Sequence, residues 1–156
     1  MREFIADNYL SHAAEYPDPN ETVEPLRLYL DGQEMLRAGK IDEAVALFKS
    51  AVADYPDSRH AHAGLGWALW QRHQGSQAED DLRFAMKEFI RADEIGMRYG
   101  RVHYPYPIAT GLGWLKDSTA LDSYFEKALK DGNEPYLTRL DYARGLSLLG
   151  DPRAEA

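Results

Sequence analysis

Hydrophobic residues recur along the 156-residue chain at the spacing of helices rather than strands. The clearest pattern places an alanine or leucine four residues before a phenylalanine and seven before a second alanine. It occurs three times, starting at Ala44, Ala85 and Leu121. Steps of three, four and seven bring side chains to one face of a helix. Sustained period-two alternation is missing from the sequence, so the pattern predicts an all-α protein.

Turn residues and helix caps divide this pattern into about eight helices. Gly39 and Gly150 are suited to end helices, and Ser58 and Ser118 are candidate N-caps. The segment 76–79, Ser-Gln-Ala-Glu, has the capping-box pattern, in which the glutamate reaches back to the N–H of the capping residue. The expected helices cover residues 2–15, 24–38, 41–54, 58–73, 76–99, 105–117, 119–131 and 135–149.

Short sequence segments recur, which indicates an internal repeat. Residues 63–67 read Ala-Gly-Leu-Gly-Trp, and residues 110–114 read Thr-Gly-Leu-Gly-Trp. Gly66 lies 34 residues after Gly32. A glycine allows a second helix to approach closely, where a larger side chain would clash. We therefore expect close helix contacts at these glycines, with phenylalanine rings filling the space between helix pairs.

Residues 25–58 resemble a tetratricopeptide repeat, a unit of about 34 residues with the pattern W-x2-L-G-x2-Y, A-x3-F and P. Leu28 and Met35 stand at its two aromatic positions, and Asp31 departs from its leucine. The remaining positions match directly, at Gly32, Ala44, Phe48 and Pro56.

The resemblance implies an all-α fold, a right-handed superhelical solenoid of antiparallel helix pairs with about eight helices. In the second unit the element that begins at Ala85 arrives about seven residues late, which we interpret as a second helix two turns longer. The expected units are an N-terminal helix or half repeat over 1–24, repeat 1 over 25–58, repeat 2 over 59–100, repeat 3 over 101–134, and a C-terminal helix over 135–156 that is a truncated repeat or a cap.

In this family the first helices of successive units line a concave groove, and the residue after the glycine tends to face it. The resemblance therefore implies an aromatic groove for a peptide or helix of a partner protein. Trp67 and Trp114 could instead pack between neighbouring units. Trp70 fits the core better than the groove. The expected groove residues are Tyr29, Gln33, Arg37, Trp67, Trp70, Gln71, Trp114 and Arg144.

Residues 99–107 are rich in tyrosine and proline and lie between the second and third units. Such a stiff loop on a rigid scaffold is a candidate for partner contact. The alternative is a spacer that covers the long second helix. The candidate contact residues are Arg101, His103, Tyr104 and Tyr106.

The net charge of −8 argues against nucleic acid and against docking on an anionic membrane. The lack of cysteine excludes disulfides and thiolate metal sites. No run approaches the roughly 18 apolar residues of a membrane span, and the N-terminus lacks the apolar core of a secretory signal. We therefore expect a cytoplasmic protein without membrane insertion.

Catalytic and metal-binding motifs are not evident. No two of the five histidines stand four apart, and no H-E-x-x-H is present. The acid pairs at 80–81 and 93–94 are expected on the solvated side of helix 76–99. We expect no enzyme activity, cofactor or metal. The leading prediction is a protein-binding adaptor or scaffold. The alternatives are a self-associating module, a fragment of a longer solenoid, and a secretion or pilus chaperone.

Overall fold

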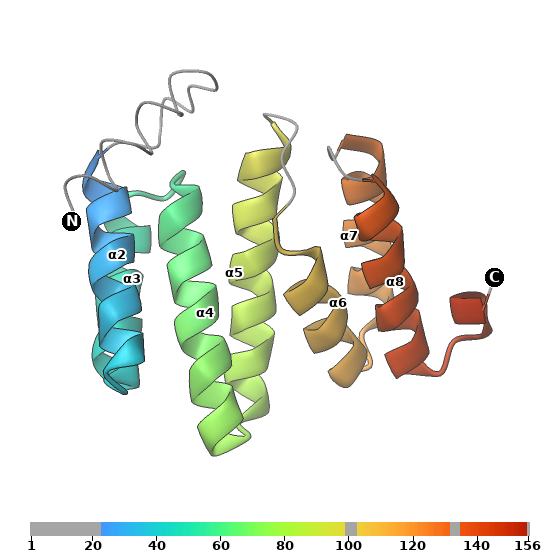
Figure 1. Cartoon of the computed structure of the whole chain (residues 1–156), viewed down its shortest axis with the longest axis horizontal. Coiled ribbons are helices and arrows are strands. Elements are labelled where there is room, and N and C mark those ends of the chain that lie inside the picture. The colour runs from blue at the N-terminus through green and yellow to red at the C-terminus, as the bar shows by residue number, and fades with distance from the viewer. Residues whose placement is uncertain (1–22, 99–102, 132–134, 156) are drawn as a thin grey trace.

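The computed structural model describes residues 23–98, 103–131 and 135–155, and this part of the chain is entirely helical. Successive helices run in opposite directions and stand in a row (Figure 1). The helices are α2 (Val23–Arg37), α3 (Ile41–Asp54), α4 (Arg59–Ser76), α5 (Glu79–Met97), α6 (Pro105–Trp114), α7 (Ser118–Asp131) and α8 (Pro135–Leu149), followed by the 3₁₀ helix η1 (Pro152–Glu155).

The all-α prediction is therefore confirmed, with seven of the expected helices in the described residues. The expected helix 2–15 lies outside them. We call α2, α4, α6 and α8 the first helices, and α3, α5 and α7 the second helices. Each of α2, α4 and α6 is followed by its second helix, and α8 packs beside both α6 and α7.

Three of the expected helix ends are confirmed. Gly39 and Gly150 both have φ of 75°, a left-handed conformation that favours glycine after the last helical turn. At the start of α4, the Ser58 hydroxyl accepts a hydrogen bond of 3.2 Å from the N–H of Ala61. These caps fix where α2, α4 and α8 begin or end.

The two other serine caps were predicted wrongly. Ser76 is the last residue of α4, and α5 begins after Ala78, without a side-chain cap. Ser118 is already inside α7. Asp117 directly precedes Ser118, and its carboxylate accepts a hydrogen bond of 3.0 Å from the N–H of Ala120. Aspartate and serine cap about equally well, so the sequence alone did not separate these neighbours.

The α4–α5 pair is longer than the other pairs. α4 has 18 residues and α5 has 19, whereas the sequence predicted helices over 58–73 and 76–99. The sequence attributed the late position of the Ala85 element to a longer second helix alone, whereas both α4 and α5 are longer than the helices of the other pairs. In an antiparallel pair, an extra turn on one helix finds packing partners only if the other helix extends as well. At 1.5 Å per residue, α5 is about 28 Å long.

Glycines in the first helices receive side chains from the preceding second helix. A Cβ built on the glycine would lie between 2.2 and 2.7 Å from the side chain that packs there, closer than Cβ atoms approach. The same contact recurs at three successive interfaces. The pairs are Phe48 with Gly64, Met86 with Gly111, and Leu121 with Gly145.

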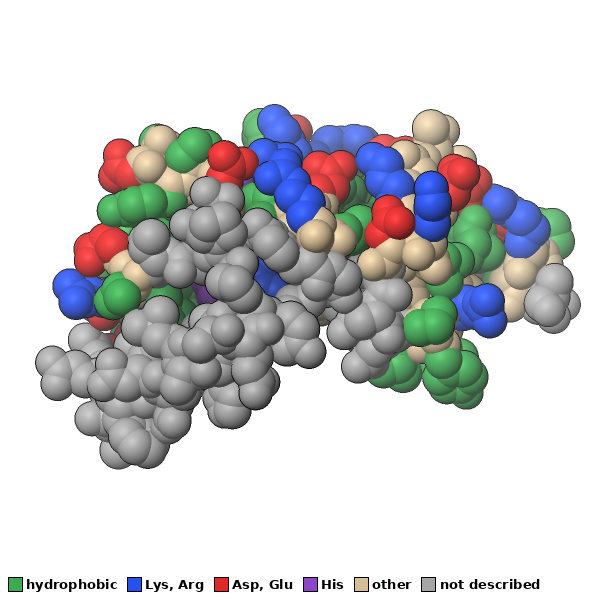
Figure 2. Space-filling model, turned by 90° about the horizontal axis from the view of Figure 1, so that it is seen from above, with side chains coloured by type: hydrophobic (Ala, Val, Ile, Leu, Met, Phe, Trp, Pro, Cys, Tyr) green, Lys and Arg blue, Asp and Glu red, His purple; other side chains and the backbone are tan. Residues whose placement is uncertain are grey.

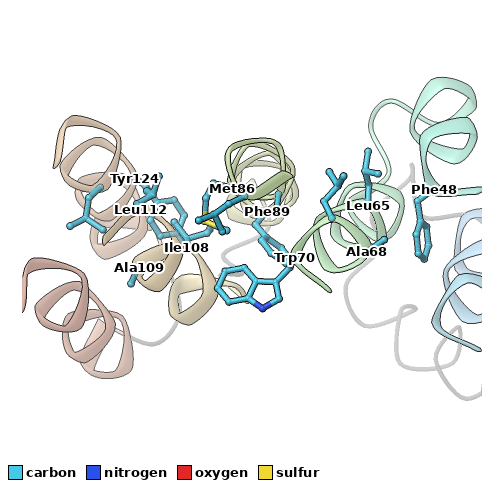
Figure 3. Close-up of a cluster of buried hydrophobic side chains, with 14 of the residues drawn as sticks. Phe48, Leu65, Ala68, Trp70, Met86, Phe89, Ile108, Ala109, Leu112 and Tyr124 are labelled. Atoms are coloured by element: carbon cyan, nitrogen blue, oxygen red, sulfur yellow. The ribbon is translucent and has the colours of Figure 1, made fainter. Parts of the chain in front are cut away.

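The phenylalanines fill the space between helices, as predicted. Phe48, Phe89 and Phe125 are completely buried. Phe48 also meets Gly32 of its own pair, and Phe89 lies 2.9 Å from where a Cβ on Gly66 would stand. Figure 3 shows Phe48 and Phe89 with neighbouring side chains in the space between α3, α4, α5 and α6.

Two of the four paired acids on α5 lie in the interior, so the expectation of a wholly solvated acidic side was wrong. Asp93 is fully buried and accepts hydrogen bonds from the N–H groups of His103 and Tyr104, at 2.8 and 3.0 Å, and from the Tyr124 hydroxyl at 2.7 Å. Asp93 therefore connects α5 to the start of α6 and to α7. Loss of hydration raises the pKa of its carboxyl group.

Asp81 is held by Arg72 of α4 through two hydrogen bonds of 2.6 and 2.8 Å. This bidentate pair lowers the pKa of the Asp81 carboxyl group. The pair lies near the α4–α5 turn. At this end the two helices extend beyond their neighbours (Figure 1). Composition alone could not separate Asp81 from exposed Asp80, or Asp93 from half-buried Glu94.

Candidate binding surface

The side chains that the sequence assigned to a groove come from all four first helices, and their exposure differs widely. Trp70 is buried, and Trp114 and Arg144 are exposed. On α2, Arg37 is exposed. The half-buried members are Tyr29, Gln33, Trp67 and Gln71.

Trp70 of α4 and Trp114 of α6 stack on each other. Their ring centroids lie 5.5 Å apart and the ring planes differ by 25°. Trp70 is 7% exposed, whereas Trp114 is 49% exposed. Figure 3 shows Trp70 reaching from α4 toward α6. A buried indole thus supports an exposed one, and Trp114 presents a large apolar ring to solvent in a fixed orientation.

Trp67 packs differently. Its ring meets Phe89 edge-on at 4.9 Å between centroids, and Tyr104 stacks on Phe89 at 5.3 Å. Trp67 and the loop candidate Tyr104 therefore share one buried phenylalanine. Both side chains are half-buried, so each keeps a solvent-facing part while contributing to the packing around Phe89.

Two of the remaining candidates come together at the start of α6. The Arg144 guanidinium lies 4.7 Å from the ring centre of Tyr106, a cation–π contact between α8 and α6. Arg144 also lies 3.8 Å from Asp141. His103 is exposed, and Arg101 lies outside the described residues. Tyr29 contacts His60 and Phe48, at 5.4 and 6.3 Å between ring centroids.

A cavity of about 520 Å³ opens beside Trp114, between the α4–α5 turn and the end of α6. Sequence reasoning missed most of its residues, because it ended α4 three residues too early and treated segment 76–79 as a cap. The only signal in the sequence that could have indicated these residues is the break in the helical pattern near Gln77. The cavity is lined by His73, Gln74, Gln77, Glu79, Leu82, Trp114 and Leu115.

The family model described as the tetratricopeptide repeat matches residues 35–82. The resemblance read from the sequence is confirmed over this segment. This segment contains α3 and α4, and therefore Phe48, Gly64, Trp67 and Trp70. Neither the curated proteins nor the solved structures yield a match to the chain.

A second cavity, of about 630 Å³, lies on the second-helix side and joins the tetratricopeptide segment to α7. His62 of the segment is tied there to Glu88, at 2.6 Å, and to the Pro56 carbonyl at 2.9 Å. Figure 2 shows lysine and arginine side chains along this side of the molecule. The surrounding Arg83 and Arg91 are paired with acids, so the cavity carries no concentrated charge of one sign.

Beyond the tetratricopeptide segment, α8 exposes a group of apolar side chains. Tyr136 is 72% exposed, and Leu137 and Leu140 are each 51% exposed. Figure 2 shows hydrophobic side chains gathered at this end of the molecule. The opposite face of α8 packs on α6 and α7 through Gly145 and Leu146.

The part of the chain that the structure describes offers neither a metal-binding cluster nor a membrane-spanning helix. No group of three or more histidines or acids stands close enough there to hold a metal ion. None of the described helices combines the length and the hydropathy of a membrane span.

Proposed function

We propose that this protein is a non-catalytic adaptor whose first-helix face binds a peptide or helix of a partner protein. The observation that carries the proposal is the stack of exposed Trp114 on buried Trp70. Tetratricopeptide repeats are protein-interaction modules, which supports the same conclusion from the family match.

The physical reason lies in the indole itself. Tryptophan combines a large apolar surface with an N–H donor, and it is enriched among the residues that dominate binding free energy. An indole that already has its bound orientation loses little conformational entropy when a partner covers it. Trp114 meets this condition because Trp70 holds one of its faces.

Neighbouring side chains extend the surface in both directions. Half-buried Trp67 and Gln71 continue it along α4, and the Arg144–Tyr106 pair continues it toward α8. Polar groups beside apolar anchors give orientation to a bound segment. In this proposal Trp114 supplies most of the binding free energy, and the polar neighbours select the partner.

Catalysis and cofactors are not part of the proposal. The two buried acids, Asp81 and Asp93, are both engaged in hydrogen bonds that join helices. A structural role accounts for them fully. We also propose a cytoplasmic location for this protein.

Affinity capture from an extract of the cells that make the protein tests the proposal. The immobilised chain should retain a discrete partner, and Trp114→Ala should lose it. Phe84→Ala is the matched control, because Phe84 is also an exposed aromatic residue, 55% exposed, and lines neither cavity. Equal retention by wild type and Trp114→Ala would rule out the proposed site.

Self-association through α8 is a second candidate, favoured by the exposed Tyr136, Leu137 and Leu140. Light scattering over a range of concentrations tests it. A dimer that Leu140→Glu converts to a monomer, while Phe84→Glu does not, would support this candidate. A monomer at every concentration would exclude it.

A further inference from the structure

The cavity beside Trp114 has an apolar wall and a polar wall. Trp114, Leu82 and Leu115 supply the apolar side chains, from α6, α5 and the residue that follows α6. The α4–α5 turn supplies the polar ones. Its shape depends on Gln77, which adopts the left-handed conformation with φ of 58° between the two helices.

Three polar side chains of this cavity, His73, Gln77 and Glu79, each offer a hydrogen-bond acceptor. The Nδ1 atom of His73 lies 2.8 Å from the carbonyl oxygen of Ala78, which can only accept, so Nδ1 carries the hydrogen. In the neutral ring, Nε2 is then an acceptor. The Gln77 amide donates its N–H to the carbonyl of Gln74, at 3.2 Å, which leaves the Gln77 Oε1 atom as an acceptor.

Glu79 adds a negative charge. Arg83 donates two hydrogen bonds to it, at 2.6 and 3.0 Å, and both go to Oε1. Among the described residues, none donates a hydrogen bond to Oε2 that the structure records. One oxygen of this carboxylate is therefore open to a further donor at the cavity, although Arg83 already offsets part of the charge.

We propose that this cavity binds an arginine side chain of the partner. A guanidinium is planar, always charged and carries five N–H donors without an acceptor. Its flat face would stack on the exposed indole of Trp114, and its edge would donate to Glu79 Oε2 and Gln77 Oε1. The alkyl stem would lie against Leu82 and Leu115.

Lysine fits this arrangement less well, because its ammonium is compact, strongly hydrated and unable to stack. The net charge of −8 adds a long-range attraction for basic segments. The inference rests on the proposed function only in assigning the arginine to a partner protein. The recognition itself is a property of the cavity.

Titration of the ¹⁵N-labelled protein with N-acetyl-arginine methylamide tests the inference by NMR. The three tryptophans give three indole N–H signals, and Trp114→Phe identifies the one from Trp114. This signal should move with the arginine compound. N-acetyl-citrulline methylamide, which has the same shape without the charge, should bind at least several-fold more weakly.

Two variants of α5 sharpen the test, with circular dichroism as the check on folding. Glu79→Gln should weaken arginine binding about two- to five-fold, the range expected for an exposed ion pair. Arg83→Gln should strengthen it, because it removes a competing cation from the same carboxylate. Opposite effects at Glu79 and Arg83 cannot come from a general loss of stability.

Nα-acetyl-lysine methylamide, titrated in the same way, should bind more weakly than the arginine compound. Equal affinity for the arginine and citrulline compounds, tighter binding of the lysine compound, or an unmoved Trp114 signal would each overturn the inference. A partner that needs Trp114 but is indifferent to Glu79→Gln would also overturn it and leave the proposed function standing. Conversely, a Trp114 signal that responds to arginine while no partner depends on Trp114 would contradict the proposed function alone.

Discussion

The Phe48 ring lies where a side chain on Gly64 would project, with its Cε1 atom 2.2 Å from the position of a Cβ. The Phe48 ring is fully buried, so it cannot relieve this clash by turning out into solvent. We therefore predict that Gly64→Ala lowers the free energy of unfolding by about 1–3 kcal/mol, the usual cost of overpacking a core. Urea unfolding followed by circular dichroism measures this change.

Gly75→Ala is the matched control for that experiment. Gly75 lies in the same helix, and nothing approaches its Cβ position within 4 Å. Alanine is the better helix former by about 1 kcal/mol, so this substitution should stabilise the protein or leave it unchanged. Equal losses at both positions would show that the approach of Phe48 is not what makes Gly64→Ala costly.

The two buried acids of α5 should affect stability in opposite directions as the pH changes. Burial raises the pKa of Asp93 above its ordinary value of 3.8, so the folded state binds this proton more tightly than the unfolded chain does. The resulting stability is fully present below pH 3.8 and is lost as the pH rises through the raised pKa. The stability of wild type relative to Asp93→Asn should therefore decline over that window.

The pair with Arg72 lowers the pKa of Asp81. Its contribution is present above pH 3.8 and is lost as the pH falls through the lowered pKa. The advantage of wild type over Asp81→Asn should therefore shrink toward acid pH. Urea unfolding of the three proteins between pH 3 and pH 7 provides both comparisons, and slopes of the same sign would refute the assignment.

The contact between Arg144 and Tyr106 should contribute weakly to the packing of α8 on α6. Exposed cation–π pairs contribute about 0.5–1 kcal/mol. A double-mutant cycle with Arg144→Gln and Tyr106→Leu should give a coupling energy in that range. A coupling energy of zero would mean that the two side chains are neighbours without a favourable interaction.

The glycine and phenylalanine positions made much of the fold predictable. Their spacing placed Phe48, Phe89 and Phe125 in the core, and the glycine after α2 and the serine before α4 fixed helix ends. The lengths of α4 and α5 were not predictable, because residues 74–79 are compatible with a helix, a turn or a cap. Packing of one long arm against the other decides between these possibilities.

The candidate site was predictable only in part. Repeat spacing placed Trp67 and Trp114 at equivalent helical positions and favoured a core position for Trp70. It could not tell that Trp114, rather than Trp67, is the exposed indole. The cavity beside Trp114 depends on the unusual length of one hairpin, and the burial of Asp93 depends on hydrogen bonds from His103, Tyr104 and Tyr124. In the local sequence, the cavity shows only as the break in the helical pattern near Gln77, and the burial of Asp93 does not show at all.

The affinity of the captured partner for the Trp114→Ala protein tests the central claim most directly, measured by isothermal titration beside wild type and the Phe84→Ala control. We predict a loss of at least about 2 kcal/mol for Trp114→Ala, roughly 30-fold in Kd, with the control close to wild type. A folded Trp114→Ala protein that binds within twofold of wild type would contradict the account.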